Sequence, residues 1–231
     1  MLTVAATTIA VQGSEERFPV RRVYCVGRNY ADHAREMGAD PDREPPFYFT
    51  KPADAVFTAD EGYLGGAAGV VPYPPQTSNL HHEIELVVAI GTGGAEIATD
   101  VALQHVWGYC VGVDLTRRDL QDVAKQTRRP WDLSKGFDAS APVSLLVPAA
   151  DVDPGHGRIW VSVDGQLRQE GDLADQIWPV ADVIAHLSAS VTLAPGDLIM
   201  TGTPSGVGPI ERGQQVAGGI DGIGELHFTV Q

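Results

Sequence analysis

The stretch NLHHEIELVVAIG, residues 79 to 91, places two glutamates one residue apart at the start of an otherwise apolar run. Side chains of a strand alternate between its two faces, so Glu83 and Glu85 share one face and Ile84 begins the other. Apolar residues continue both faces, which predicts a strand buried on both sides. Two neighbouring buried carboxylates are destabilised by desolvation and mutual repulsion unless a cation lies between them. The alternative is a solvated rim at the start of the strand, where glutamates are usually exposed.

A third carboxylate, Asp114, ends the apolar run VWGYCVGV, where packing again explains a charge poorly. If the two runs form adjacent strands, Asp114 lies beside Glu83 and Glu85. Three carboxylates suit Mg²⁺ or Mn²⁺ better than zinc, and Ca²⁺ also accepts oxygen ligands. The segment HHEIE lacks the i, i+4 histidine pair of a zinc motif, so we interpret His81 and His82 as supporting or structural residues.

Length and composition predict one globular domain over residues 1–231, with a short β segment at 1–20. The formal net charge of -14 argues against nucleic acid or an anionic membrane as the main partner. No signal-peptide pattern or membrane-length apolar run is visible, so we expect a cytoplasmic protein. Cys25 and Cys110 lack any metal or redox spacing and are expected to be buried thiols.

Strand signals outnumber helix signals without a regular alternation, which predicts an α+β, β-rich fold rather than a doubly wound sheet. Asp164 and Gly165 lie between alternating segments and predict a β-hairpin. Helices are expected over three segments, residues 29–38, 115–128 and 174–189. Asn29 is the candidate N-cap of the first and Gly38 its end, and Pro179 starts or kinks the third.

Five segments carry a wider resemblance: GRNYADHAREMG, NLHHEIELVVAIG, VGVDLTRRDLQ, PWDLSKGFDASAPVS and LIMTGTPSGVG. In this order and spacing they resemble the fumarylacetoacetate hydrolase family over residues 22 to 230, and within it the acylpyruvate and fumarylpyruvate hydrolases. The resemblance implies a single catalytic domain folded as a mixed β-sandwich roll, usually a homodimer. It also implies a divalent metal held by Glu83, Glu85 and Asp114, in agreement with the strand argument.

His33 and Glu36 are three positions apart on the first expected helix and can face the same side. Taken alone, the polar segment DHARE is better explained as a solvated helix face. The resemblance aligns these residues with the family's water-activating pair, in which His33 takes a proton from water and Glu36 orients the imidazole.

Residues 114 to 135 concentrate six of the chain's 16 basic residues: Arg117, Arg118, Lys125, Arg128, Arg129 and Lys135. This concentration is expected where an anion binds a strongly acidic protein. The alternative is a salt-bridged helix surface, which we expect to account for Lys125 and at least one of Arg128 and Arg129.

The resemblance assigns substrate contacts to four of the matched positions. Lys135 matches the active-site lysine, and Arg118 and Gln121 match the loop that closes over the substrate. Thr203 can offer its hydroxyl to a carboxylate. Arg117 is a candidate for a bidentate contact to a second substrate carboxylate, which favours fumarylpyruvate over acetylpyruvate.

The implied activity is hydrolysis of the carbon-carbon bond of an acylpyruvate, a small diketo acid of aromatic-acid catabolism. Three alternatives stay open on the same residues. They are decarboxylation of oxaloacetate, isomerisation of a hydroxymuconate-type diacid, and binding of a keto acid without turnover.

Overall fold

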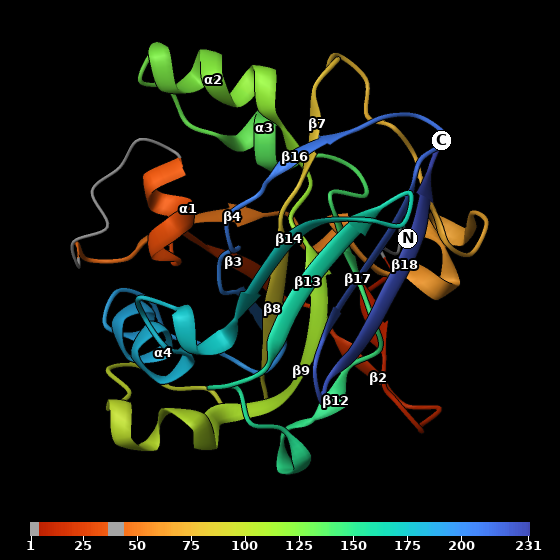
Figure 1. Cartoon of the computed structure of the whole chain (residues 1–231). Coiled ribbons are helices and arrows are strands. Elements are labelled where there is room, and N and C mark those ends of the chain that lie inside the picture. Colours follow the sequence, from red (N-terminus) through yellow and green to blue (C-terminus); the bar gives the residue numbers. More distant parts are fainter. Residues whose placement is uncertain (1–4, 37–43) are drawn as a thin grey trace, which may run out of the picture.

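The computed structural model describes residues 5–36 and 44–231 and is built around a curled, mixed sheet of eight strands (Figure 1). Its order is β4-β3-β15-β8-β9-β11-β5, with β12 paired to β9, and β8 is antiparallel to both of its neighbours. The strands are β3 (Arg22–Gly27), β4 (Phe47–Lys51), β5 (Val56–Thr58), β8 (Ile84–Ile90), β9 (Val106–Val113), β11 (Ala141–Val143), β12 (Val147–Pro148) and β15 (Asp197–Met200). This strand-rich architecture confirms the predicted fold class.

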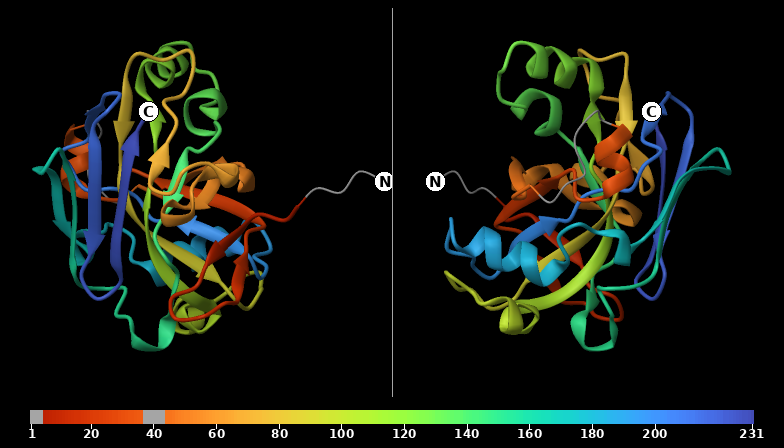
Figure 2. Two further views of the ribbon diagram at one scale, coloured as in Figure 1. Left: turned by 90° about the vertical axis from the view of Figure 1, so that its right-hand side faces the viewer. Right: turned by 60° about the vertical axis from the view of Figure 1, so that its left-hand side comes forward.

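A five-stranded sheet of order β14-β13-β17-β18-β6 lies against one face of the larger sheet (Figure 2). Its strands are β6 (Val70–Val71), β13 (Arg158–Val163), β14 (Gln166–Asp172), β17 (Gln215–Ile220) and β18 (Gly224–Val230). Asp164 and Gly165 join β13 to β14 with φ of 51° and 74°, the left-handed pair that a two-residue hairpin requires. The predicted hairpin is therefore confirmed.

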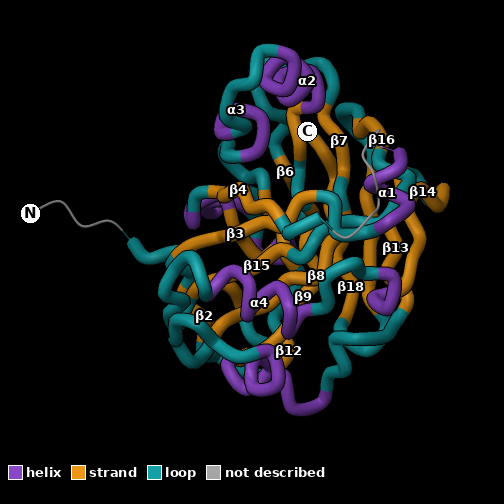
Figure 3. Tube along the Cα trace, turned by 90° about the vertical axis from the view of Figure 1, so that its left-hand side faces the viewer, coloured by secondary structure: helices purple, strands orange, loops and turns teal. Residues whose placement is uncertain are grey.

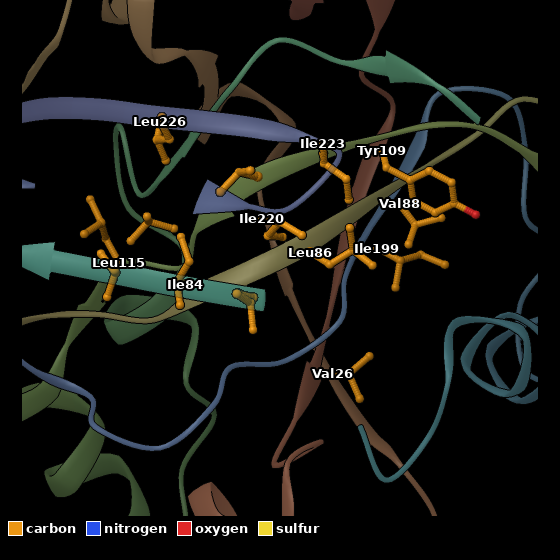
Figure 4. Packing of buried hydrophobic residues seen from close by; sticks show 14 of the residues in the cluster. Val26, Ile84, Leu86, Val88, Tyr109, Leu115, Ile199, Ile220, Ile223 and Leu226 are labelled. Carbon is orange, nitrogen blue, oxygen red and sulfur yellow. The ribbon is translucent and has the colours of Figure 1, made fainter. Parts of the chain in front are cut away.

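Strand β8 is buried on both faces, as its sequence predicts. Ile84, Leu86 and Val88 point into the main core between the two sheets (Figure 4). Val87 and Ala89 belong to a second cluster on the opposite face. That face is covered by the hairpin of β1 (Thr8–Ala10) and β2 (Arg17–Pro19), which lies within the expected N-terminal β segment.

The remaining elements are a small sheet and the helices (Figure 3). A small sheet of order β10-β7-β16 comprises β7 (Leu80–His82), β10 (Thr116–Arg117) and β16 (Gly208–Ile210). The α-helices are α1 (Ala31–Glu36), α2 (Arg118–Gln126), α3 (Asp132–Lys135) and α4 (Val180–Ser188). Within the described part of the chain, none of the helices is long and apolar enough to span a membrane.

The expected helices need two corrections. Helix α1 begins at Ala31, and Asn29 does not cap it, because the Asn29 side chain donates to the carbonyls of Trp178 and Thr201 and accepts from the Trp178 N–H. Gly38, its expected end, lies outside the described residues. In the second segment, strand β10 precedes the helix. Pro179 immediately precedes α4 and starts it without a kink.

Cys25 and Cys110 are free, buried thiols in the core of the larger sheet. Burial raises the pKa of both thiols. The expectation for both residues is confirmed.

Candidate active site and metal centre

The pairing of β8 with β9 brings the three predicted carboxylates together. Ile84 lies opposite Val113, so the residues flanking them meet, and the Asp114 N–H donates to the Glu83 carbonyl at 2.8 Å. One carboxylate oxygen from each of Glu83, Glu85 and Asp114 lies within 4.8 Å of the other two. The three residues are 6%, 1% and 0% exposed, so the solvated-rim interpretation is wrong.

Three buried cations neutralise two of these carboxylates. Lys135 Nζ bridges Glu83 Oε2 at 2.8 Å and Asp114 Oδ2 at 2.7 Å. Arg118 binds the other Glu83 oxygen at 2.5 Å, and Lys51 Nζ lies 2.8 Å from Asp114 Oδ1. Burial alone would raise the pKa of Glu83, but Lys135 and Arg118 outweigh it and hold that pKa well below its usual range.

Glu85 has no such partner among the described residues. Its Oε2 accepts the Gly202 N–H at 2.7 Å, and no described cation forms an ion pair with it. Burial, Asp114 and Glu83 together raise the pKa of Glu85 well above its usual range. A hard divalent cation among the three carboxylates would remove this conflict, and carboxylate oxygens are the donors that Mg²⁺ and Mn²⁺ prefer. The residues therefore fit such an ion.

A cavity of about 30 Å³ opens onto this cluster and collects most of the predicted site. Its lining includes the predicted residues His33, Glu83, Glu85, Arg118, Gln121, Lys135 and Thr203. Asp114 and Glu36 contact lining residues from behind. The volume suits water or an ion, so a ketonic acid requires the walls to move apart.

His33 and Glu36 form the predicted pair at one side of the cavity. His33 Nδ1 lies 3.2 Å from Glu36 Oε2, and the Gly206 N–H donates to the same carboxylate at 3.2 Å. His33 is buried and Glu36 is exposed, so a fully solvated helix face is wrong for the histidine. Burial lowers the pKa of His33, with Glu83 and Glu36 opposing that shift. The imidazole is thus neutral at neutral pH, with Nδ1–H donated to Glu36 and Nε2 carrying the lone pair.

Thr203 is oriented by a buried glutamine that sequence reasoning missed. Gln169 Oε1 lies 2.8 Å from His82 Nδ1 and accepts the Ile84 N–H at 3.2 Å, so its amide nitrogen faces Thr203. Gln169 Nε2 donates to Thr203 Oγ1 at 2.7 Å. Because this hydroxyl oxygen already accepts, its hydrogen is left to donate into the cavity.

Lys51 was also missed, although its sequence contained a signal. The residue ends the apolar strand FYFTK, as Asp114 ends its own apolar run, and both charges are buried at strand ends. Arg28 lines the cavity with no comparable signal.

Two basic residues lie elsewhere than expected. Lys125 is not part of a salt-bridged surface, because it lines the cavity and forms no ion pair with a described carboxylate. Arg117 does not line the cavity. Its guanidinium lies 4.4 Å from the centre of the Phe137 ring and donates to the Leu133 carbonyl at 3.2 Å.

The strand-rich roll and its buried acidic cluster place this chain in a class of enzymes whose sequence pattern is well defined. Residues 22–231 match the family model described as Fumarylacetoacetate (FAA) hydrolase C-terminal. The chain belongs to this family, as the resemblance predicted.

Similar proteins within the family differ in their reactions. A fumarylpyruvate hydrolase from Pseudomonas aeruginosa, solved in complex with Mn²⁺ and pyruvate, is 52% identical with a TM-score of 0.94. The comparison covers 100% of this chain and 97% of that one. A mitochondrial oxaloacetate decarboxylase from Dictyostelium discoideum is 41% identical over 91% of this chain and 94% of its own length. A mitochondrial oxaloacetate tautomerase from Bos taurus is 41% identical over 91% of this chain and 92% of its own length.

Proposed function

We propose that this protein is a divalent-metal-dependent hydrolase that cleaves the carbon-carbon bond of acylpyruvates, converting fumarylpyruvate to fumarate and pyruvate. The observation that carries the proposal is the cavity in which His33 lies with the carboxylates of Glu83 and Glu85. The 52% identity to a fumarylpyruvate hydrolase that holds Mn²⁺ and pyruvate supports it. The proposed ion is Mg²⁺ or Mn²⁺, held by Glu83, Glu85 and Asp114, and the proposed assembly is a homodimer, which light scattering tests.

The charge balance of the site favours an anionic substrate. The three carboxylates face three buried cations, Lys51, Arg118 and Lys135. When all three carboxylates are ionised these groups are neutral together, so a bound divalent ion adds two uncompensated positive charges. A ketonic acid brings a carboxylate and, during cleavage, further negative charge on its keto oxygen. The site is therefore best neutralised when the substrate reacts.

The chain's own residues supply the proton transfers. When bound, the divalent ion supplies Lewis-acid polarisation of the keto acid. His33 Nε2 accepts a proton from water, and Glu36 orients the imidazole and stabilises its charged form. The water oxygen adds to the acyl carbonyl carbon, and the bond from this carbon to the pyruvate methylene breaks. The electron pair leaves with the pyruvate portion, which recovers the proton. Lys135 faces the developing negative charge, and Thr203 donates to a substrate oxygen.

Oxaloacetate is the second candidate substrate, by decarboxylation or tautomerisation. It is favoured by the 41% identity to enzymes with these activities across nine-tenths of the chain. The same neutral histidine can move a proton between carbon and oxygen without activating water. Hydrolase and tautomerase chemistry therefore differ here in the role of water rather than in the ligand set.

Steady-state kinetics on fumarylpyruvate, acetylpyruvate and oxaloacetate with Mg²⁺ and with Mn²⁺ test the proposal. We expect the highest kcat/KM for fumarylpyruvate, with stoichiometric fumarate and pyruvate. Glu83→Gln removes a ligand and the partner of Lys135 and should lower kcat by about a hundredfold or more. Higher efficiency on oxaloacetate, with no release of fumarate, would assign the protein to the second candidate.

A further inference from the structure

Two cations at the cavity have no carboxylate partner in the described part of the chain. They are Arg28, which is exposed and marks the outer side of the cavity, and Lys125, which is half-buried on α2. Neither forms an ion pair with a described residue, although the chain carries 30 acidic residues and a net charge of -14. In so acidic a protein, two cations beside one cavity that form no ion pair within residues 5–36 and 44–231 indicate a local preference for an anion.

Aromatic rings hold both cations in place. Phe47 occupies space that only glycine leaves free, because a Cβ on Gly27 would lie 2.0 Å from the ring. The Arg28 guanidinium carbon lies 5.6 Å from the Phe47 ring centre, and Lys125 Nζ lies 5.5 Å from that of Trp131. The two rings meet edge to face at 5.6 Å. The cations are thus positioned by one aromatic wall rather than by carboxylates.

The backbone at Arg28 is also constrained. Arg28 has a φ of 56°, in the left-handed region that residues other than glycine seldom adopt. The next residue, Asn29, is fully buried and hydrogen-bonded through its side chain to Trp178 and Thr201. Such a conformation persists only where neighbouring structure holds it, and it is common at ligand sites.

The two cations repel each other, and Arg118 also repels Lys125, while Asp122 and Glu83 attract it. Burial and the charge of Arg118 lower the pKa of Lys125, and Arg28 adds to this effect against the opposing charge of Asp122. A bound anion would relieve this repulsion. The inner end of the cavity already provides for one carboxylate, so the outer cations are available to a second.

We propose that Arg28 and Lys125 bind the distal carboxylate of a ketonic dicarboxylate whose keto-acid end lies at the acidic cluster. This inference rests on the proposed function and replaces Arg117, which lies outside the cavity, as the source of selectivity for a dicarboxylate. Once the cavity walls have moved apart, a linear dicarboxylate would span the site from its buried end to its exposed end.

The test compares fumarylpyruvate with acetylpyruvate, which share the pyruvate end and differ in the distal carboxylate. Arg28→Gln removes a charge-assisted hydrogen bond to the distal carboxylate. We therefore expect the kcat/KM for fumarylpyruvate, divided by that for acetylpyruvate, to fall about tenfold to a hundredfold. Lys125→Gln should lower the same ratio independently, and Arg28→Lys should restore part of it. Circular dichroism checks that each variant is folded.

Two arginines serve as matched controls. Arg117→Gln removes the cation that sequence analysis favoured, and Arg129→Gln removes one that lines a neighbouring hollow of about 450 Å³ beyond Trp131. Neither should change the ratio. A fall in the ratio confined to either control, or equal losses on both acids in Arg28→Gln and Lys125→Gln, would overturn the assignment.

The proposal and the proposed function fail in different ways. If the wild type hydrolyses neither acid, the proposed function is wrong, and both acids can then be titrated by calorimetry in the presence of Mn²⁺ without being consumed. The subsite still predicts tighter binding of fumarylpyruvate than of acetylpyruvate, and loss of that preference in Arg28→Gln. Equal binding of the two acids by the wild type would refute the subsite itself.

Discussion

At the scale of single residues, the site separates side chains that look equivalent in the sequence. Glu83 and Glu85 are one residue apart and both buried, yet Glu83 is paired with two cations and Glu85 with a backbone N–H. The pKa values of His33 and His81 also differ because their surroundings differ. Burial and Arg118 lower the pKa of His81 to about 4 against the opposing charge of Glu83, whereas at His33 both Glu83 and Glu36 oppose the lowering by burial. Local charge, not residue type, decides what each group can do.

The pairing of His33 with Glu36 predicts a pH dependence. In the proposed mechanism the active form of His33 is neutral, and burial lowers its pKa, so kcat should fall with decreasing pH below the usual range of histidine. Glu36→Gln removes a charge and a hydrogen bond that raise this pKa, so the acid limb should move to lower pH. The value of kcat should also fall about tenfold to a hundredfold. A pH–rate profile of both proteins measures this, and a limb that stays fixed would remove His33 as the base.

At the scale of elements, strand pairing places the chemistry. The pairing of β8 with β9 sets Asp114 beside Glu83, and the hairpin of β13 and β14 delivers Gln169 to Thr203. Gln169 is the buried position of an otherwise exposed stretch of β14, so the smaller sheet contributes to the site as well as to the core. The hairpin of β13 and β14, which is distant from Glu83 in the sequence, therefore positions Thr203 in the site.

Gln169 predicts a positioning effect through Thr203. Gln169→Leu leaves the Thr203 hydroxyl free to turn away from the cavity and leaves His82 without its acceptor. We expect kcat/KM for the keto acid to fall about tenfold, mainly through KM, since the lost contact orients substrate. In Gln169→Glu, the new carboxylate can accept a hydrogen bond from the Thr203 hydroxyl. This variant should therefore reduce donation from Thr203 to the substrate further. Thr203→Val is the matched variant, and its effect should not add to that of Gln169→Leu.

At the scale of the whole molecule, the acidic cluster lies at the start of β8, on the face of the larger sheet opposite the main core, and its charge state is linked to global stability. Strand β8 crosses the centre of the larger sheet with every residue buried. Glu83, Glu85 and Asp114 are almost fully excluded from solvent, so their charges depend on neighbouring groups rather than on bulk water. Metal binding and folding are thus coupled, because an ion that binds the native cluster stabilises the native state.

Unfolding with urea, in EDTA and in Mn²⁺, should distinguish the two glutamates. Without metal, Glu83→Gln leaves buried cations unpaired and should cost about 3 to 5 kcal/mol. Glu85→Gln replaces a carboxyl whose ionisation is opposed by burial, Asp114 and Glu83, and should be neutral or stabilising by about 1 kcal/mol. Excess Mn²⁺ should stabilise the wild type by about 2.7 kcal/mol at a hundredfold excess over Kd, and Glu85→Gln by less. Equal losses in both metal-free variants would contradict this charge assignment.

The sequence by itself determined the β-rich class, the Asp164-Gly165 hairpin and the acidic cluster, because each leaves a local signal. Glu83, Glu85 and Asp114 are charges at the ends of apolar runs, where burial makes them conspicuous. Only the tertiary structure decided the contacts of Asn29, Gln169, Arg28 and Lys125. These contacts involve partners that are distant in the chain or rings and cavities formed after folding, and neither periodicity nor spacing encodes them.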